Sequence, residues 1–273
     1  MQMLRDLCPP ILFNFAKKVA RRHSRVPVDR QSLQKLDLSD RQLLVSDPDI
    51  LGVYRSYFVQ EKYRFTTETE SPLIIDCGAY VGVSVHFWKR LYPKARVIAF
   101  EPDPVNFAAL ASNCLGLDDV FLHNAALWSS DGTVPFSASA SVGGHVASLT
   151  NTILGEKIEV RALRLCDFLR ERVDMLKLDI EGSELEVLLD CRDHLKNVRN
   201  IFIEYHSFED MPQRLGTFFT LLEEAGFRIH AHSELPAERP FMDRPVINRK
   251  DFRLNIFGIK SDVPPNGCSP VHG

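Results

Sequence analysis

Short apolar runs alternate with stretches of helical periodicity from Pro72 to the end of the chain. Continuous apolar runs of this length are typical of parallel strands that are buried on both faces of a sheet. This alternation predicts a doubly wound α/β domain. The expected strands are residues 73–76, 96–101, 120–124, 175–179, 201–205, 227–230 and 252–259, and the expected helices are residues 83–91, 104–113, 184–189 and 214–225.

The first seventy residues have a different pattern. After Pro9 and Pro10, residues 11–25 place apolar side chains at helical spacing and basic side chains mostly opposite them, which predicts a basic amphipathic helix. Such a helix either docks on the main domain with its basic face in water, or offers that face to anionic acceptors and membrane headgroups as a peripheral contact. Residues 50–58 predict another helix. The expected organisation is a helical N-terminal extension (1–70), the α/β domain (71–262) and a C-terminal tail (263–273).

One segment interrupts the strand and helix alternation. Residues 129–155 are rich in Ser, Gly, Ala and Thr and have no clear period, which predicts a long loop. Loops this long are often lids or binding loops, and Gly143 with Gly144 is a candidate hinge. A lid or binding loop and a tolerated surface insertion are both compatible with this composition.

Composition narrows the class of partner. Among 273 residues, 33 basic and 36 acidic side chains give a net charge of −3, so no nucleic-acid partner is expected. The six cysteines are widely spaced without a C-x-x-C motif, which predicts reduced thiols and a cytoplasmic location. No apolar run approaches the ~20 residues of a membrane span, so neither a transmembrane helix nor a signal peptide is expected.

A glycine-containing turn follows the first strand of the predicted sheet. Asp76 ends the strand, and Gly78 and Gly82 follow with the spacing G-x-x-x-G before a helix. Ligands of open α/β sheets bind at such strand ends, where glycine lets the backbone come close. The turn lacks the third glycine of the dinucleotide fingerprint and the Gly-Lys-Ser/Thr of a P-loop. It therefore predicts a small-molecule site that need not hold a phosphate.

The next two strands end in residues suited to a nucleoside. Glu101 ends the second strand, and a carboxylate there can accept two hydrogen bonds from a ribose diol. Asn124 and Ala125 end the third strand, where small residues can admit a flat base.

Ionisable residues mark the ends of the fourth and fifth strands. Period-two alternation places Lys177 with Asp179 on one face, and Glu204 with His206 on one face, among apolar neighbours. Charges rarely lie inside such strands unless they are paired. These groups are a candidate site, with His206 as a ready proton acceptor.

Five segments together resemble the FkbM family of S-adenosylmethionine-dependent methyltransferases, over about residues 50–260: residues 75–82, 100–102, 124–126, 176–182 and 204–206. The most specific is the lysine, aspartate, glutamate and glycine pattern of residues 177–182. Tyr80 is a departure, because the family usually has Asn at this position.

The resemblance implies a class I methyltransferase (Rossmann-like) domain with a seven-stranded, mostly parallel sheet whose last strand is antiparallel. It also implies S-adenosylmethionine as methyl donor and a hydroxyl of a sugar, glycan or secondary metabolite as acceptor. The first loop would hold the methionine part, Glu101 the ribose, and Asn124 and Ala125 the adenine. The implied cofactor-binding residues are Asp76, Gly78, Ala79, Tyr80, Gly82, Glu101, Pro102, Asn124, Ala125 and Asp179.

The expected chemistry needs a proton acceptor, because an alcohol is a poor nucleophile at neutral pH. The candidate catalytic residues are His206, Asp179, Glu181 and Glu204. One of them takes the proton directly, or Asp179 and Glu204 hold Mg²⁺ that lowers the pKa of the hydroxyl. A purely structural pair of Lys177 and Asp179 is the third reading.

Two other functions share some of these features. A nicotinamide-dependent oxidoreductase would have the same strand, turn and ribose acid, although the missing third glycine argues against it. A non-catalytic nucleotide-binding module would keep the fold without needing the acids Asp179, Glu181 and Glu204, which are all present.

Overall fold

The computed structural model describes residues 34–38, 41–45, 50–138, 145–146, 156–234, 237–243, 246–247 and 249–260. The expected basic helix at residues 11–25 and the expected tail at 263–273 lie outside this part, so the membrane contact and the domain boundaries stay predictions. Among the described residues, no helix combines the length and the apolar character needed to cross a bilayer. Four cysteines of this part are free and buried: Cys77, Cys114, Cys166 and Cys191.

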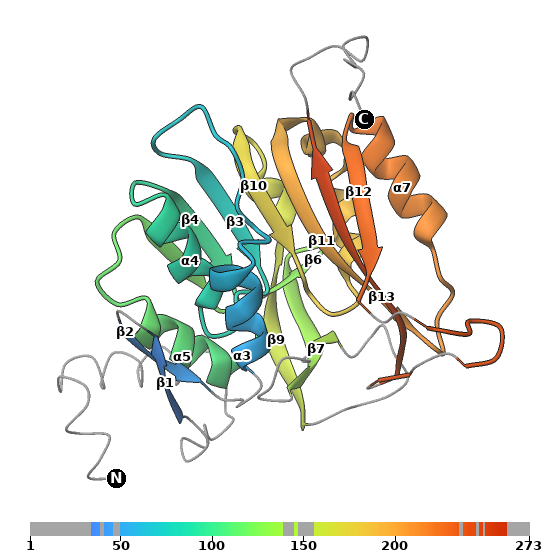
Figure 1. The fold of residues 1–273 in the computed structure, drawn as a ribbon, viewed down its shortest axis with the longest axis horizontal. Coiled ribbons are helices and arrows are strands. Elements are labelled where there is room, and N and C mark those ends of the chain that lie inside the picture. The colour runs from blue at the N-terminus through green and yellow to red at the C-terminus, as the bar shows by residue number, and fades with distance from the viewer. Residues whose placement is uncertain are drawn as a thin grey trace.

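A seven-stranded sheet forms the centre of the molecule (Figure 1). Its order is β12-β13-β11-β10-β3-β4-β5, and β13 is antiparallel to both of its neighbours while the other pairs are parallel. This confirms the expected mostly parallel sheet with an antiparallel last strand. The strands are β3 (Leu73–Cys77), β4 (Arg96–Phe100), β5 (Val120–His123), β10 (Val173–Leu178), β11 (Val198–Phe208), β12 (Arg228–Ser233) and β13 (Lys250–Ile259).

Alternate residues of these strands face two separate cores. Ile75 packs with the helices α6 (Glu184–Asp190) and α7 (Leu215–Glu224). Its neighbour Ile74 packs on the other face with α3 (Ile50–Tyr54), α4 (Val83–Leu91) and α5 (Pro104–Asn113). This two-sided burial explains why the strands are continuously apolar in sequence. The four helices predicted between the strands are confirmed: α4 (Val83–Leu91), α5 (Pro104–Asn113), α6 (Glu184–Asp190) and α7 (Leu215–Glu224). Short 3₁₀ turns add Leu165–Phe168 and Arg192–Asn197.

The strand order reverses between β3 and β10, which are adjacent although about a hundred residues apart in sequence. Crossovers leave in opposite directions from such a switch point, and the crevice at the carboxyl ends of the two strands is the usual ligand site of open α/β sheets. The register pairs Asp76 of β3 with Lys177 of β10, so these two residues lie at that edge.

The segment before the sheet contains a helix and a hairpin. The predicted helix at 50–58 is confirmed as α3 (Ile50–Tyr54) followed by a π-helical turn (Arg55–Val59). The strands β1 (Gln34–Leu38) and β2 (Arg41–Val45) pair within the region expected to be helical. The side chain of Asn113 explains part of this: it accepts from Leu44 N at 2.7 Å and donates to Leu44 O at 2.8 Å, as a neighbouring strand would.

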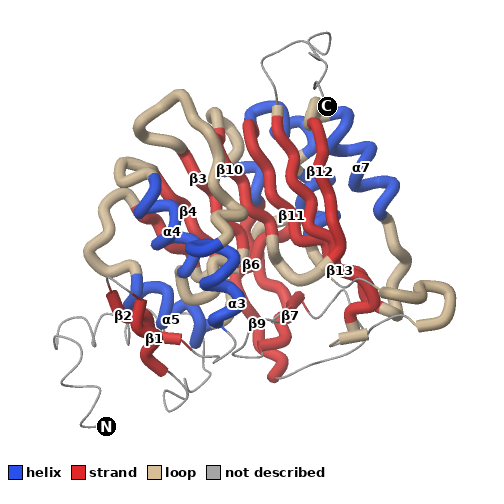
Figure 2. The backbone as a smooth tube through the Cα atoms, viewed as in Figure 1, coloured by secondary structure: helices blue, strands red, loops and turns tan. Residues whose placement is uncertain are grey.

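The expectation of a long loop at 129–155 is wrong for nine residues. A second, four-stranded sheet contains β6 (Ala126–Trp128), β7 (Gly132–Ala138), β8 (His145–Val146) and β9 (Glu156–Arg164), seen below β3 and β10 in Figure 2. Val134 and Phe136 alternate inward against Ile158 and Val160, a pattern that the Ser- and Gly-rich composition concealed. Residues 139–144 and 147–155, including the hinge candidates, lie outside the described part, so the lid stays a prediction.

Candidate functional site

The glycine turn after β3 is as tight as its sequence suggests. Gly78 has a φ of +85°, and a Cβ added there would lie 1.9 Å from the backbone oxygen of Asp179. Gly82 has a φ of +91°, and its Cβ would lie 2.8 Å from Leu110 Cδ1. Both conformations favour glycine, and at Gly78 no side chain fits. The ends of β3 and β10 therefore approach each other closely at this turn.

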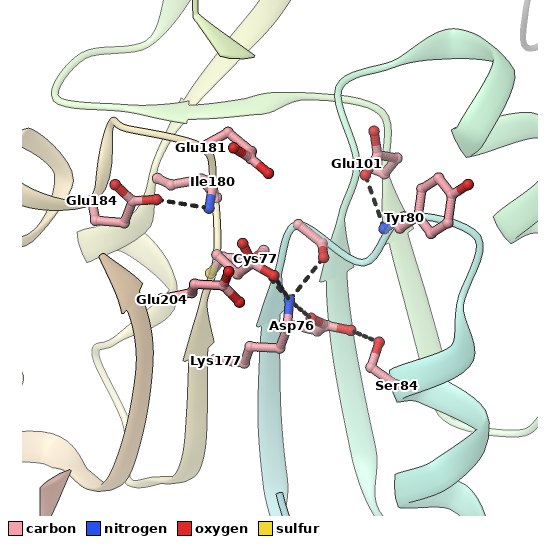
Figure 3. Close-up of polar contacts among 12 residues, drawn as sticks. Asp76, Cys77, Tyr80, Ser84, Glu101, Lys177, Ile180, Glu181, Glu184 and Glu204 are labelled. Atoms are coloured by element: carbon pink, nitrogen blue, oxygen red, sulfur yellow. Dashed lines mark hydrogen bonds and ion pairs between the residues drawn. The ribbon is translucent and has the colours of Figure 1, made fainter. Parts of the chain in front are cut away.

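Tyr80 lies at the tip of the turn in a strained conformation. Its φ is +51°, which is uncommon for an aromatic residue. Its backbone nitrogen donates to Glu101 Oε2 at 2.9 Å, which ties the turn to the end of β4 (Figure 3). Strained residues held in this way are frequent at functional sites.

Glu101 is buried beside this turn. Its Oε1 accepts a second backbone hydrogen bond from Asp103 N at 2.9 Å. Burial, and then the Asp103 carboxylate, raise the pKa of Glu101 to about 8, although both N–H donors act in the other direction. Asn124 donates to the backbone oxygens of Glu101 and Pro102 at 2.9 and 3.1 Å. The structure thus brings Glu101, Pro102 and Asn124 together, with Ala125 buried next in sequence.

A buried lysine links the ends of β3 and β10. Lys177 Nζ lies 3.4 Å from Asp76 Oδ1 and 3.4 Å from Asp179 Oδ2, and it donates to Gly78 O at 2.9 Å. Ser84 donates to the other oxygen of Asp76 (Figure 3). Burial raises the pKa of Asp179 to about 6, against the opposing effect of Lys177. One cation therefore compensates two acids, as buried charges require.

Glu184 anchors the turn that carries Glu181. Its carboxylate accepts from Ile180 N at 3.2 Å and from Gly182 N at 2.9 and 3.0 Å. Glu181 between them has a φ of +60°, so the turn is held in a strained conformation. Glu184 was not predicted as a site residue. The signal that could have identified it is an acid at the start of a helix directly after a glycine-containing turn, because free N–H groups gather there.

His206 lies behind the acids rather than in the open part of the site. Its Nδ1 is 3.0 Å from Glu184 Oε1, and its Nε2 is 3.6 Å from Glu181 Oε2 and 3.4 Å from Glu204 Oε1. Burial alone would lower the pKa of His206, but these three acids outweigh it and raise the pKa well above its ordinary value. This environment favours the imidazolium, whereas a general base must be neutral.

The acids around His206 have further basic partners. Lys250 pairs with Glu181, and Arg253 Nη1 lies 3.4 Å from Glu204 Oε1. Burial alone would raise the pKa of Glu204, but hydrogen bonding and charge from His206, together with Arg253, lower it to about 2. Glu204 is therefore a weak proton acceptor.

The charged groups around His206 also decide whether the site can hold the expected Mg²⁺. Ligand atoms of Asp179, Glu181 and His206 lie within 4.8 Å of one another, which is close enough for one ion. However, Mg²⁺ prefers oxygen ligands to an imidazole, and Glu181 and Glu204 already have cationic partners. The donor set fits Mg²⁺ poorly, including the predicted pair of Asp179 and Glu204.

A cavity of about 460 Å³ opens at the carboxyl ends of β3 and β10. Asp179, Glu181 and Glu204 line it, whereas His206 and Glu101 are absent from its lining. Many residues that line this cavity were not predicted from the sequence, because most of them come from distant segments that carry no motif. The missed residues are Gly52, Val53, Ser56, Tyr57, Lys62, Tyr63, Val83, Ser84, Glu234, Arg253 and Asn255.

Comparisons with known proteins agree with this geometry. A family model for the Methyltransferase FkbM domain matches residues 76–229. "Methyltransferase sdnD" of Sordaria araneosa is 31% identical, over 65% of this chain and 82% of its own length. "31-O-demethyl-FK506 methyltransferase FkbM" of Streptomyces tacrolimicus is 30% identical, over 67% of this chain and 83% of its own. "2-O-methyltransferase NoeI" of Sinorhizobium fredii is 27% identical, over 52% of this chain and 66% of its own.

Proposed function

Because the chain belongs to the FkbM methyltransferase family, we propose that it transfers a methyl group from S-adenosylmethionine to a hydroxyl oxygen of a sugar, glycan or secondary metabolite. The names of two relatives support oxygen as the accepting atom. One is a 31-O-demethyl-FK506 methyltransferase and the other a 2-O-methyltransferase. Family membership also argues against a nicotinamide-dependent oxidoreductase and against a non-catalytic nucleotide-binding module.

The observation that carries the proposal is the joining of the glycine turn to Glu101 through Tyr80 N. The residues fit the cofactor: the turn residues Gly78, Ala79 and Tyr80 line the cavity, and Glu101, Pro102 and Asn124 lie together at the strand end to which Tyr80 N is bonded. Glu101 would accept from the ribose, while Pro102, Asn124 and Ala125 would lie at the base. The turn residues Gly78, Ala79, Tyr80 and Gly82 would surround the methionine part. When bound, the cofactor supplies an electrophilic methyl group.

Asp179 is the proton acceptor in this proposal. It lines the cavity, and its pKa of about 6 leaves it ionised near neutral pH yet basic enough to take a proton. Glu204 is less suitable because its pKa is about 2. The carboxylate of Asp179 would receive the hydroxyl proton as the oxygen attacks the methyl carbon. The main contribution of the protein would be to align the acceptor oxygen, the methyl carbon and the sulfur. His206 acts as a positioning residue that holds Glu181 and Glu204.

Calorimetry and mass spectrometry together test the proposal. The full chain should bind S-adenosylmethionine, and a hydroxyl-bearing acceptor should then gain the mass of one methylene. The matched variants Asp179→Asn and Glu224→Gln each lose one negative charge, but Glu224 lies in an exposed ion pair with Arg192. Only Asp179→Asn should slow the transfer. A protein that binds no S-adenosylmethionine would overturn the proposed function.

A further inference from the structure

One wall of the cavity comes from outside the segment that the family model matches. Lys62, Glu234 and Asn255 all line the cavity, and all lie outside residues 76–229. Glu234 is their centre: Lys62 Nζ donates to its Oε1 at 3.2 Å, and Asn255 Nδ2 donates to the same oxygen at 2.5 Å. This wall therefore joins the segment after α3 to the end of β12 and to β13.

The charges of the lining are already paired. Of the described lining residues, Lys62 pairs with Glu234, Lys177 with Asp76 and Asp179, and Arg253 with Glu204. The lining contains the acids Asp179, Glu181, Glu204 and Glu234 against those three bases. An anionic ligand would find no uncommitted cation in this lining and would lose its hydration on entering. This arrangement favours a neutral ligand.

Arg253 and Asn255 add unused hydrogen-bonding capacity to this wall. Both residues line the cavity. Asn255 Oδ1 accepts no hydrogen bond from the described residues and Arg253 Nε donates none to them, and both atoms are closed off from solvent. Unpaired buried polar groups are costly, so a ligand group that reached both side chains would satisfy them. A hydroxyl group suits this role because it donates and accepts at once.

Another side of the cavity is aromatic and complements the polar wall. Tyr57 and Tyr63 line it, and their rings stack at 4.1 Å between centroids. Together, an aromatic side and a polar wall match a ring that has a C–H face and a hydroxyl rim.

We propose that Lys62, Glu234, Arg253 and Asn255 form the acceptor-binding wall and that they select a neutral polyhydroxylated acceptor, a glycosyl unit. The inference rests on the proposed function. In it, acceptor hydroxyls bind the ion pair of Lys62 with Glu234 and the side chain of Asn255, and one hydroxyl faces Asp179. An acceptor with a carboxylate would add a charge that the lining cannot pair.

Matched acceptors test the class of ligand. The full chain and labelled S-adenosylmethionine are incubated with p-nitrophenyl hexosides, the corresponding hexuronides, and cyclohexanol. A hexoside should be methylated with a kcat/KM at least about tenfold above its hexuronide and above cyclohexanol, the scale set by one lost or unpaired hydrogen bond. Equal or better methylation of a hexuronide or of cyclohexanol overturns the inference, as does a panel in which no hexoside is methylated.

Variants test the wall itself. Glu234→Gln and Lys62→Met should each raise the acceptor KM by about tenfold while kcat and the Kd of S-adenosylhomocysteine stay nearly unchanged. Glu224→Gln is the matched control, because it breaks the exposed pair with Arg192 and should leave KM unchanged. If both wall variants keep the KM of this control, the wall does not bind the acceptor.

The two proposals fail in different ways. Absence of S-adenosylhomocysteine binding, measured by calorimetry without acceptor, counts against the methyltransferase proposal. Normal binding of S-adenosylhomocysteine, with methylation confined to non-glycosyl acceptors or undetected across the panel, overturns only the acceptor class.

Discussion

Tyr80 and Glu101 are joined by a single hydrogen bond, in which the backbone nitrogen of Tyr80 donates to Glu101 Oε2 at 2.9 Å. The bond couples the strained tip of the glycine turn to the carboxylate proposed to hold the ribose. A ligand that binds Glu101 therefore binds the side chain that holds this turn in its conformation.

Replacing this carboxylate should weaken cofactor binding. Glu101→Ala removes the proposed acceptors of the ribose diol and also leaves Tyr80 N and Asp103 N without their partner. The loss should be roughly 1 to 3 kcal/mol in the binding free energy of S-adenosylhomocysteine. Calorimetry on a variant shown to be folded measures it, and an unchanged Kd would rule out the ribose assignment.

Cofactor affinity should depend on pH through the same residue. The pKa of Glu101 is raised to about 8, so the free protein holds this group mostly protonated at neutral pH. Diol hydroxyls donate best to the ionised form, so binding releases a proton and affinity falls by up to about tenfold per pH unit as the pH drops below about 8. Calorimetry in buffers of different ionisation enthalpy reports the proton. If wild type and Glu101→Gln release the same number of protons on binding, Glu101 is not the source of the proton.

The pH profile of catalysis should follow Asp179. Because its pKa is about 6, kcat should fall as the pH drops below about 6 and level off above it. The charge on His206 lowers the pKa of Asp179, so His206→Ala should move this limb to higher pH. A His206→Ala variant that instead loses the limb altogether, with kcat down by about 10²–10⁴, would identify His206 as the base.

His206 should also stabilise the fold in a pH-dependent way. Its pKa is raised well above its ordinary value, so its contribution is complete below that value and is lost as the pH rises through the folded value. His206→Ala leaves Glu181, Glu184 and Glu204 without their buried partner and should cost about 3–5 kcal/mol near pH 6. Denaturant titrations near pH 6 and at alkaline pH measure the difference. If the loss of unfolding free energy in His206→Ala grows as the pH rises, His206 does not stabilise the fold as a charged imidazolium.

Gly78 should tolerate no side chain. Gly78→Ala brings a Cβ to within 1.9 Å of Asp179 O, so β3 and β10 must separate, and S-adenosylhomocysteine binding should be lost. Gly216→Ala in α7 is the control, since its Cβ meets nothing within 4 Å and should stabilise the helix by about 0.5–1 kcal/mol. Binding that survives in Gly78→Ala would show that the turn adapts.

Much of the central sheet is predictable because burial on both faces leaves a plain signal. Residues 83–91 and 104–113 even match α4 and α5 residue by residue. The hairpin at Gln34–Val45 and the strand at Gly132–Ala138 escape prediction, because their pairing partners determine them more than their own composition does.

The candidate site, like the fold, is predictable from the sequence only in part. Strand ends predict Asp76, Glu101 and Asp179, because topology alone brings parallel strand ends to one edge. The roles of the ionisable groups depend on distances that spacing does not give. The three carboxylates that contact His206, for example, come from α6, β11 and the turn at Glu181, and Lys250, which pairs with Glu181, comes from β13. Lys62 and Glu234 lie 172 positions apart, so nothing local in the sequence links them.

The most direct test of the account follows the methyl group itself. S-adenosylmethionine with a ¹³C-labelled methyl is incubated with a glycosyl acceptor and either wild-type protein or Asp179→Asn, and the product is examined by NMR. The account predicts the label on a hydroxyl oxygen, with Asp179→Asn slower by about 10²–10⁴. A label on nitrogen or carbon, or an Asp179→Asn variant as fast as wild type, would contradict it.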